Sequence, residues 1–116
     1  MTLFSSKITL LVRDKCKHIY FTDTLEIAFG KHPHNLFDYY YPVQDRCTWF
    51  HIKGKPSPHV ILYTKKESLS SDEDVHQWIK GMLTQRESVI YTPLDNIILQ
   101  SQKRVHIVDP SKVHTL

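Results

Sequence analysis

The sequence predicts an α+β fold, in which a mainly antiparallel β-sheet or small sandwich is covered by one amphipathic helix over about residues 71–83. Two observations favour it. Short branched or aromatic apolar segments recur along the chain, and polar turns of hairpin length separate most of them. Only one stretch, ending at Leu83, has apolar residues at helical spacing. The 116 residues, 41% of them hydrophobic, suit a single domain over 1–116.

The first half of the chain contains five segments with the composition of strands. In order they are Ile8–Val12, His18–Thr22, Leu25–Phe29, Thr48–Ile52 and His59–Thr64. A polar turn joins the first two, and a turn around Gly54 joins the last two, so both pairs are expected to be hairpins. Residues 30–46 are predicted to be irregular, and within them the aromatic segment 36–42 fits either a short helical turn or an extended edge.

The predicted helix begins at a capping box, because Ser70 stands three residues before Glu73. Acidic residues 72–74 place negative charge at the positive end of the helix dipole. Apolar residues then recur at intervals of three and four, at Val75, Trp78, Ile79, Met82 and Leu83. Trp78 lies on this stripe, and we therefore expect it to fill the core.

Three further strands are predicted after the helix, at Ser88–Tyr91, Ile97–Leu99 and Val105–Val108. The polar loop 100–104 makes the last two a hairpin. Pro93 is expected at an edge or a turn, because proline cannot donate a hydrogen bond to a sheet.

The two cysteines, Cys16 and Cys47, are expected to be free thiols in a reducing compartment. The N-terminal residues 1–7 lack the pattern of a secretory signal, and no apolar run approaches the roughly 18–20 residues of a membrane span. These features predict a cytoplasmic protein without a membrane partner. No Gly-rich phosphate loop, nucleophile elbow or Cys-x-x-Cys pair occurs, so we expect no metal and no cofactor.

His51 and His59 flank the Gly54 turn and are expected to face each other across the hairpin. A histidine pair beside lysine can perform acid–base chemistry on RNA without a metal. Half-exposed histidines on a sheet surface are the favoured interpretation, because no acidic residue stands where it would fix a tautomer. A metal-independent ribonuclease is therefore an alternative to the expected non-enzymatic function.

Basic residues concentrate in the predicted turns and loops, and the formal net charge is +3. The residues in question are Lys53, Lys55, Lys65, Lys66, Arg86, Lys103 and Arg104. Turns of a β-scaffold can present such charges to a phosphate backbone. On charge alone, a solvated surface is the favoured interpretation. A small DNA-binding module is the leading prediction only when the order of elements is considered as well.

From residue 48 to residue 108, the order of elements resembles the LytTR-type DNA-binding domain of bacterial response regulators. The hairpin 48–64 and the helix Leu69–Leu83 are similar to the family's hairpin and helix, and Arg86 and Ser88 stand where it has an Arg-Ser pair on a strand. Residues 94–97 resemble its following turn, and 105–108 its closing strand. The resemblance implies DNA binding, and Arg86 is the residue that we expect to read base edges, since arginine pairs with guanine.

A protein–protein interaction module is the alternative, in the manner of a phage, plasmid or immunity-type inhibitor. Its binding surface would be the Tyr-rich loop 36–42, because tyrosine is common in interface hot spots. The residues expected to contact a protein partner, or a second copy in a homodimer, are Phe37, Tyr39, Tyr40, Tyr41 and Trp49.

Overall fold

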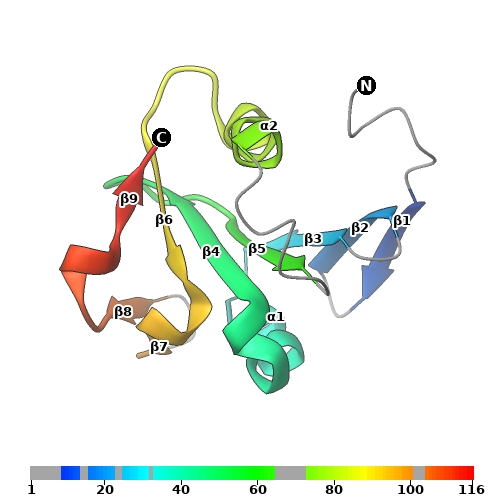
Figure 1. The fold of residues 1–116 in the computed structure, drawn as a ribbon, viewed down its shortest axis with the longest axis horizontal. Helices are drawn as coiled ribbons and strands as arrows, with labels where there is room; N and C mark the ends of the chain where they lie inside the picture. Colours follow the sequence, from blue (N-terminus) through cyan, green and yellow to red (C-terminus); the bar gives the residue numbers. More distant parts are fainter. Residues whose placement is uncertain (1–8, 14–15, 23–24, 32, 65–72, 101–103) are drawn as a thin grey trace.

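The computed structural model describes residues 9–13, 16–22, 25–31, 33–64, 73–100 and 104–116. In this part of the chain, seven strands form one sheet, and every neighbouring pair is antiparallel (Figure 1). Across the sheet they are β1 (Thr9–Arg13), β2 (Cys16–Thr22), β3 (Leu25–Gly30), β5 (His59–Thr64), β4 (Cys47–Ile52), β6 (Val89–Pro93) and β9 (His114–Thr115). The α+β class and the predicted hairpins are confirmed.

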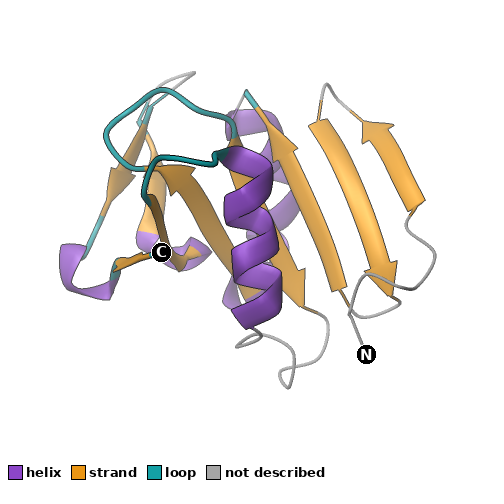
Figure 2. Cartoon of the chain, turned by 90° about the horizontal axis from the view of Figure 1, so that it is seen from above, coloured by secondary structure: helices purple, strands orange, loops and turns teal. Residues whose placement is uncertain are grey.

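The sheet lies between two helices, α1 (Pro33–Tyr40) and α2 (Glu73–Leu83), which pack on its opposite faces (Figures 1 and 2). A 3₁₀ segment, Tyr41–Arg46, connects α1 to β4. A separate two-stranded ribbon, β7 (Ile97–Leu99) with β8 (Val105–Ile107), follows β6. The arrangement is therefore a sheet covered on both faces.

Helix α1 falls within residues 30–46, which were predicted to be irregular with either a helical turn or an extended edge over 36–42. Its buried residues are Pro33, Leu36, Phe37 and Tyr40, which is the i, i+3, i+4, i+7 spacing of a helix face. Proline favours the first helical turn because its backbone angle is already set and its missing N–H is not needed there. The prediction that residues 30–46 are irregular was wrong over α1, because Pro33 starts this stripe instead of interrupting the chain.

Alternation along the central strands sends side chains into both cores. In β4, Trp49 packs on the α1 side and Phe50 on the α2 side. In β5, Ile61 faces α1, whereas Val60 and Leu62 face α2. Central strands that are apolar on both faces are typical of a sheet covered twice, so the pattern of β4 and β5 accounts for the second helix.

Helix α2 buries Val75 and Ile79 completely, but Trp78 only partly. Trp78 therefore packs at the margin of the core, and the prediction that it fills the core was wrong. The apolar face of α2 is wide. The sheet covers the centre of this face, and Trp78 lies at the edge that stays partly accessible to solvent. The capping-box residues 70–72 lie outside the described residues.

Strand β9 was not predicted, because two exposed residues carry no hydrophobic pattern. It pairs with β6 and is extended by a hydrogen bond from the backbone N–H of Leu116 to the carbonyl of Val89, 2.7 Å long. Pro93 ends β6 and precedes a 3₁₀ turn, Leu94–Asn96, in agreement with the turn expected there.

Both cysteines are free, as predicted, and the structure places both in the interior. Burial raises the pKa of the Cys47 thiol to about 12, and the thiol donates to the carbonyl of Val43 at 3.4 Å. Only a thiolate reacts quickly with a disulfide reagent. Dithionitrobenzoate should therefore label neither Cys16 nor Cys47 in the native protein and both in guanidinium, and the melting temperature should be the same with and without reductant. Rapid native labelling of Cys47, or a lower melting temperature in reductant, would contradict this.

Candidate functional site

A cleft of about 860 Å³ opens beside the turn between β4 and β5. It is lined by Lys31, His51, Gly54, Lys55, Pro56, Ser57, Pro58, His59 and Arg104. Lys31 follows β3, Arg104 precedes β8, and the remaining residues belong to the β4–β5 hairpin. The cleft thus brings together three cations from three segments that are distant in sequence. None of its lining residues is acidic.

The hairpin turn that forms one wall is held by its own polar contacts. Gly54 has a positive φ of 71°, which a glycine adopts without strain. The backbone N–H of Ile52 donates to Ser57 Oγ at 3.1 Å, and that hydroxyl donates to the carbonyl of Pro58 at 2.9 Å. The wall is therefore fixed by local geometry, with prolines on both sides of Ser57.

His59 is held in one tautomer. The indole Nε1–H of Trp49 donates to His59 Nδ1 at 3.0 Å. An indole N–H can only donate, so the neutral ring of His59 carries its proton on Nε2. Burial, reinforced by the neighbouring His51, lowers the pKa of His59 to about 4. At neutral pH His59 is consequently an uncharged hydrogen-bond donor.

His51 lies beside it, as the sequence predicted. One residue beyond the last paired positions, Phe50 and Val60, the register places His51 opposite His59, and their ring centroids are 4.7 Å apart. His51 also stacks on Trp49, with 12° between the planes, and the ring of Trp49 in turn lies 6.0 Å from that of His59, so the three rings form one cluster. Its Nδ1 is 2.7 Å from the carbonyl oxygen of Ile52, so Nδ1 carries the proton and Nε2 holds the lone pair.

Burial is also the main reason that the pKa of His51 is lowered, and the backbone groups of Ile52 and Ser57 oppose it. Both histidines are therefore neutral near pH 7. The tautomers are fixed by an indole N–H and a backbone carbonyl. From sequence, only an acidic residue was considered for this role.

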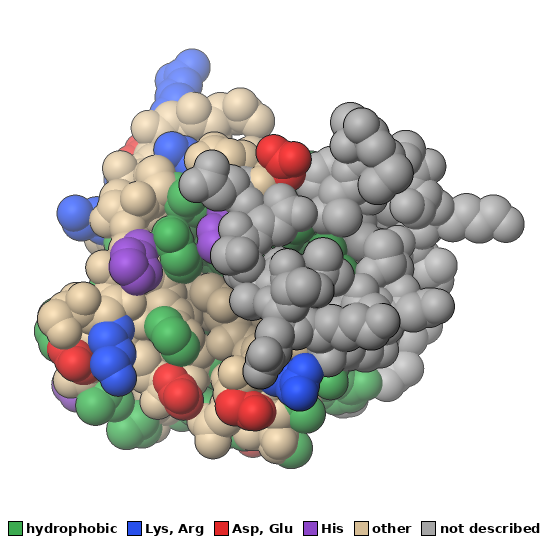
Figure 3. Space-filling view, viewed as in Figure 1, with side chains coloured by type: hydrophobic (Ala, Val, Ile, Leu, Met, Phe, Trp, Pro, Cys, Tyr) green, Lys and Arg blue, Asp and Glu red, His purple; other side chains and the backbone are tan. Residues whose placement is uncertain are grey.

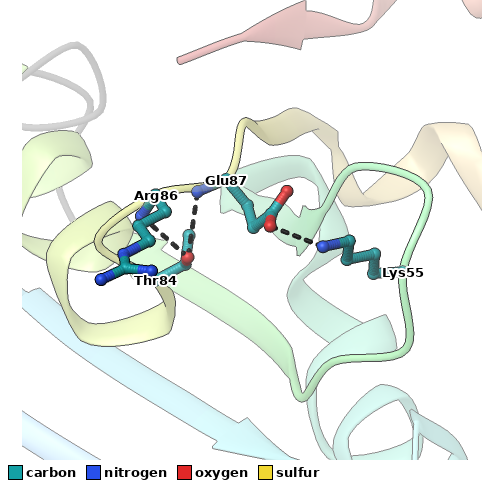
Figure 4. Close-up of polar contacts among 4 residues, drawn as sticks. All are labelled: Lys55, Thr84, Arg86 and Glu87. Carbon is teal, nitrogen blue, oxygen red and sulfur yellow. Dashed lines mark hydrogen bonds and ion pairs between the residues drawn. The ribbon is translucent and has the colours of Figure 1, made fainter.

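Lys55 is paired with an acidic residue at the rim of the cleft. Its Nζ is 2.5 Å from Glu87 Oε1, and both side chains are largely exposed (Figure 4). Thr84 Oγ1 accepts from the backbone N–H groups of Arg86 and Glu87, which fixes the turn after α2. An exposed ion pair of this kind contributes about 1 kcal/mol or less, so a phosphate can compete for Lys55.

Of the predicted DNA-binding residues, Lys55 and Arg104 line the cleft, and Lys53 and Arg86 are exposed outside it. The guanidinium of Arg86 points away from Lys55 in Figure 4. Lys65, Lys66 and Lys103 lie outside the described residues. Lys31 was not predicted to bind DNA, although it lies next to a glycine as Lys53 and Lys55 do. On the face shown in Figure 3, basic side chains alternate with acidic ones and do not merge into one patch.

The residues predicted to bind a protein partner are mostly internal. Phe37, Tyr40 and Trp49 are 0%, 1% and 2% exposed, because the face of α1 and the α1 side of β4 form one core. Tyr41 donates its hydroxyl to the carbonyl of Ile97 at 3.2 Å, whereas Tyr39 is 42% exposed. Residues 36–42, which are helical and not a loop, therefore present one of these aromatic side chains prominently to solvent.

The Tyr40 hydroxyl takes part in a buried polar group below α1. It donates to the carboxylate of Glu26 and lies 2.9 Å from His18 Nδ1. His18 Nδ1 is in turn 3.6 Å from the same carboxylate oxygen of Glu26. All three residues are buried, so this hydroxyl links two polar side chains of the sheet to the helix.

Comparison with known proteins gives no family. No family model matches the chain, and no curated protein matches it. The resemblance to the LytTR-type domain therefore stays a prediction. Within the described residues, no group of three or more potential metal-ligating side chains occurs, and no helix of that part is long and apolar enough to cross a membrane.

Proposed function

We propose that the chain is a small non-enzymatic DNA-binding module that holds backbone phosphates in the basic cleft. One observation carries the proposal: Lys31, Lys55 and Arg104 converge on a cleft whose lining contains no carboxylate. Phosphates attract such a group of cations strongly, because each contact releases a condensed counterion. A concave surface of one sign of charge also concentrates the field between its walls.

The ribonuclease alternative is less well supported by the same site. Cleavage of RNA by two histidines needs one of them as a base and the other as a protonated acid. The pKa values of His51 and His59 are both lowered, so neither ring is protonated near pH 7. The protein-binding alternative is left with Tyr39 as its one prominently exposed aromatic side chain among residues 36–42. Phosphate binding therefore remains the function that the geometry favours.

The ion pair between Lys55 and Glu87 provides a test in which affinity should rise. Glu87→Gln frees the Lys55 ammonium and removes a negative charge from the rim of the cleft. Two unit charges about 4 Å apart interact by about 1 kcal/mol in water, so DNA affinity at low salt should increase about two- to fivefold. Fluorescence anisotropy with a labelled oligonucleotide measures the change.

Asp74→Asn is the matched control, because it removes the same charge from the opposite end of α2. It should leave DNA affinity close to that of the unmodified protein. If Glu87→Gln and Asp74→Asn bind DNA equally, Lys55 makes no phosphate contact and the proposed site is wrong at that residue.

A further inference from the structure

We propose that the cleft takes its nucleic acid as a single strand, with one unpaired base held against His51 and His59. The inference rests on the proposed function and adds to it the form of the ligand and the residues that bind a base. The cleft is lined by two kinds of functional group, three cationic side chains and two imidazoles that are neutral near pH 7 because their pKa values are lowered.

The size of the cleft suits a nucleotide. Its volume of about 860 Å³ lies within the range of about 300–1,000 Å³ that is usual for small-ligand pockets. Lys31, Lys55 and Arg104 are all exposed, so a double helix can reach them from outside without entering the cleft. The two histidines lie against the hairpin wall, and His59 is only 4% exposed. A ligand that reaches His59 must therefore be as slender as a single strand.

The two rings present one donor and one acceptor. Because Trp49 occupies Nδ1 of His59, the remaining Nε2–H is a donor. Because His51 Nδ1–H donates to a backbone carbonyl, its remaining Nε2 is an acceptor. Among the residues that the structure describes, the hydrogen-bond partners of the two rings are on Nδ1, and the backbone of Ser57 is the one further group close enough to act on the pKa of His51. Nε2 of His59 is not one of the buried nitrogens that lack a partner, so it is accessible to a ligand or solvent group that accepts a hydrogen bond from it.

This pair suits a base and not a phosphate. A phosphate offers only acceptors near neutral pH, so the acceptor nitrogen of His51 would repel it. The Watson–Crick edge of a base carries a donor next to an acceptor, and proteins that recognise single strands read this edge. In a duplex the same edge is occupied by the complementary base. In this arrangement the three cations bind the phosphates, and the two imidazoles bind an unpaired base.

Trp49 acts as a positioning residue in this scheme. It does not line the cleft, but its N–H decides which nitrogen of His59 is protonated, and its ring stacks on His51. Trp49→Phe keeps an aromatic ring in the core and removes only the N–H donor. Without that donor, Nδ1 of His59 can take the proton and the donor facing the cleft is lost.

The test compares one oligonucleotide sequence as single-stranded DNA, as duplex DNA and as single-stranded RNA, by fluorescence anisotropy at about 50 mM salt, where phosphate contacts are strong. We expect the single strands to bind more tightly than the duplex. His51→Ala and Trp49→Phe should each weaken single-strand binding about tenfold, the scale of losing one good base contact, without changing duplex affinity or the salt slope. His106→Ala, which changes an exposed histidine outside the cleft, is the control.

A second measurement uses the unmodified protein, so it does not depend on whether a variant folds. Nitrogen-15 spectra of the imidazole rings should show His59 protonated on Nε2 and His51 on Nδ1, and the Nε2 signals should shift on adding the single strand but not the duplex. Equal binding of strand and duplex, with unshifted imidazole signals, overturns this inference and leaves the proposed function standing. No binding of any of the three overturns both. Tighter binding of the RNA strand keeps the inference and replaces DNA by RNA in the proposed function.

Discussion

Replacing Phe50 with alanine should lower the free energy of unfolding by about 3–5 kcal/mol, the usual cost of removing a buried aromatic side chain. Phe50 is fully buried between β4 and α2. Its ring stacks on Tyr91, with centroids 5.4 Å apart, and meets the edge of His76 at the same distance. The cavity left by the substitution would separate the sheet from α2. Equilibrium unfolding in urea, followed by circular dichroism, measures the loss.

Trp78→Ala is the informative control, because it deletes a larger side chain from the margin of the same core. Trp78 is only partly buried, so we expect it to cost less than Phe50→Ala. If Trp78→Ala is the more destabilising of the two, the packing of α2 on the sheet differs from the structure, and the original expectation that Trp78 fills the core would be restored.

Removing all three cations of the cleft should nearly abolish DNA binding. At about 50 mM salt, each lost phosphate contact costs about tenfold, so the variant with Lys31→Ala, Lys55→Ala and Arg104→Ala should bind about 100- to 1,000-fold more weakly. The slope of log K against log salt should also become shallower by about two to three, because three fewer counterions are released. Anisotropy titrations over a range of salt concentrations measure both quantities.

A charge-matched variant separates the cleft from net charge. Lys17→Ala, Lys80→Ala and Lys112→Ala remove the same three positive charges from residues that do not line the cleft. This variant should retain most of the affinity and of the salt slope. Equal losses in the two variants would mean that the protein attracts DNA through its overall charge, without a defined site.

Much of the sheet could be predicted from sequence because each of its longer strands has a recognisable local pattern of residues. Segments such as His59–Thr64 combine branched and aromatic residues, and the turns between paired strands contain glycine or charged residues. Helix α1 could not be recognised in the same way. Its stripe of apolar residues is eight residues long and begins with Pro33, so the same letters also fit a turn or an edge. Only packing against Trp49 and Ile61 decides among them.

The site was predictable in part for a similar reason. The facing of His51 and His59 follows from hairpin register, which a short turn largely determines. Lys31 and Arg104 lie beside that hairpin because segments distant in sequence pack together. The spacing of residues along the sequence does not predict such packing. The pairing of Lys55 with Glu87 also depends on the packing of distant segments. The contact of Trp49 with His59, by contrast, lies within the β4–β5 hairpin.

The most direct test of the proposed function is a titration of the unmodified protein into labelled DNA, single-stranded and duplex, at about 50 and 200 mM salt. The basic cleft predicts binding at the lower salt that is tighter than about 100 μM, the weak end of non-specific affinity, and a steep loss at the higher salt. Absence of binding tighter than about 100 μM to either form at the lower salt would contradict the assignment of the cleft to phosphates.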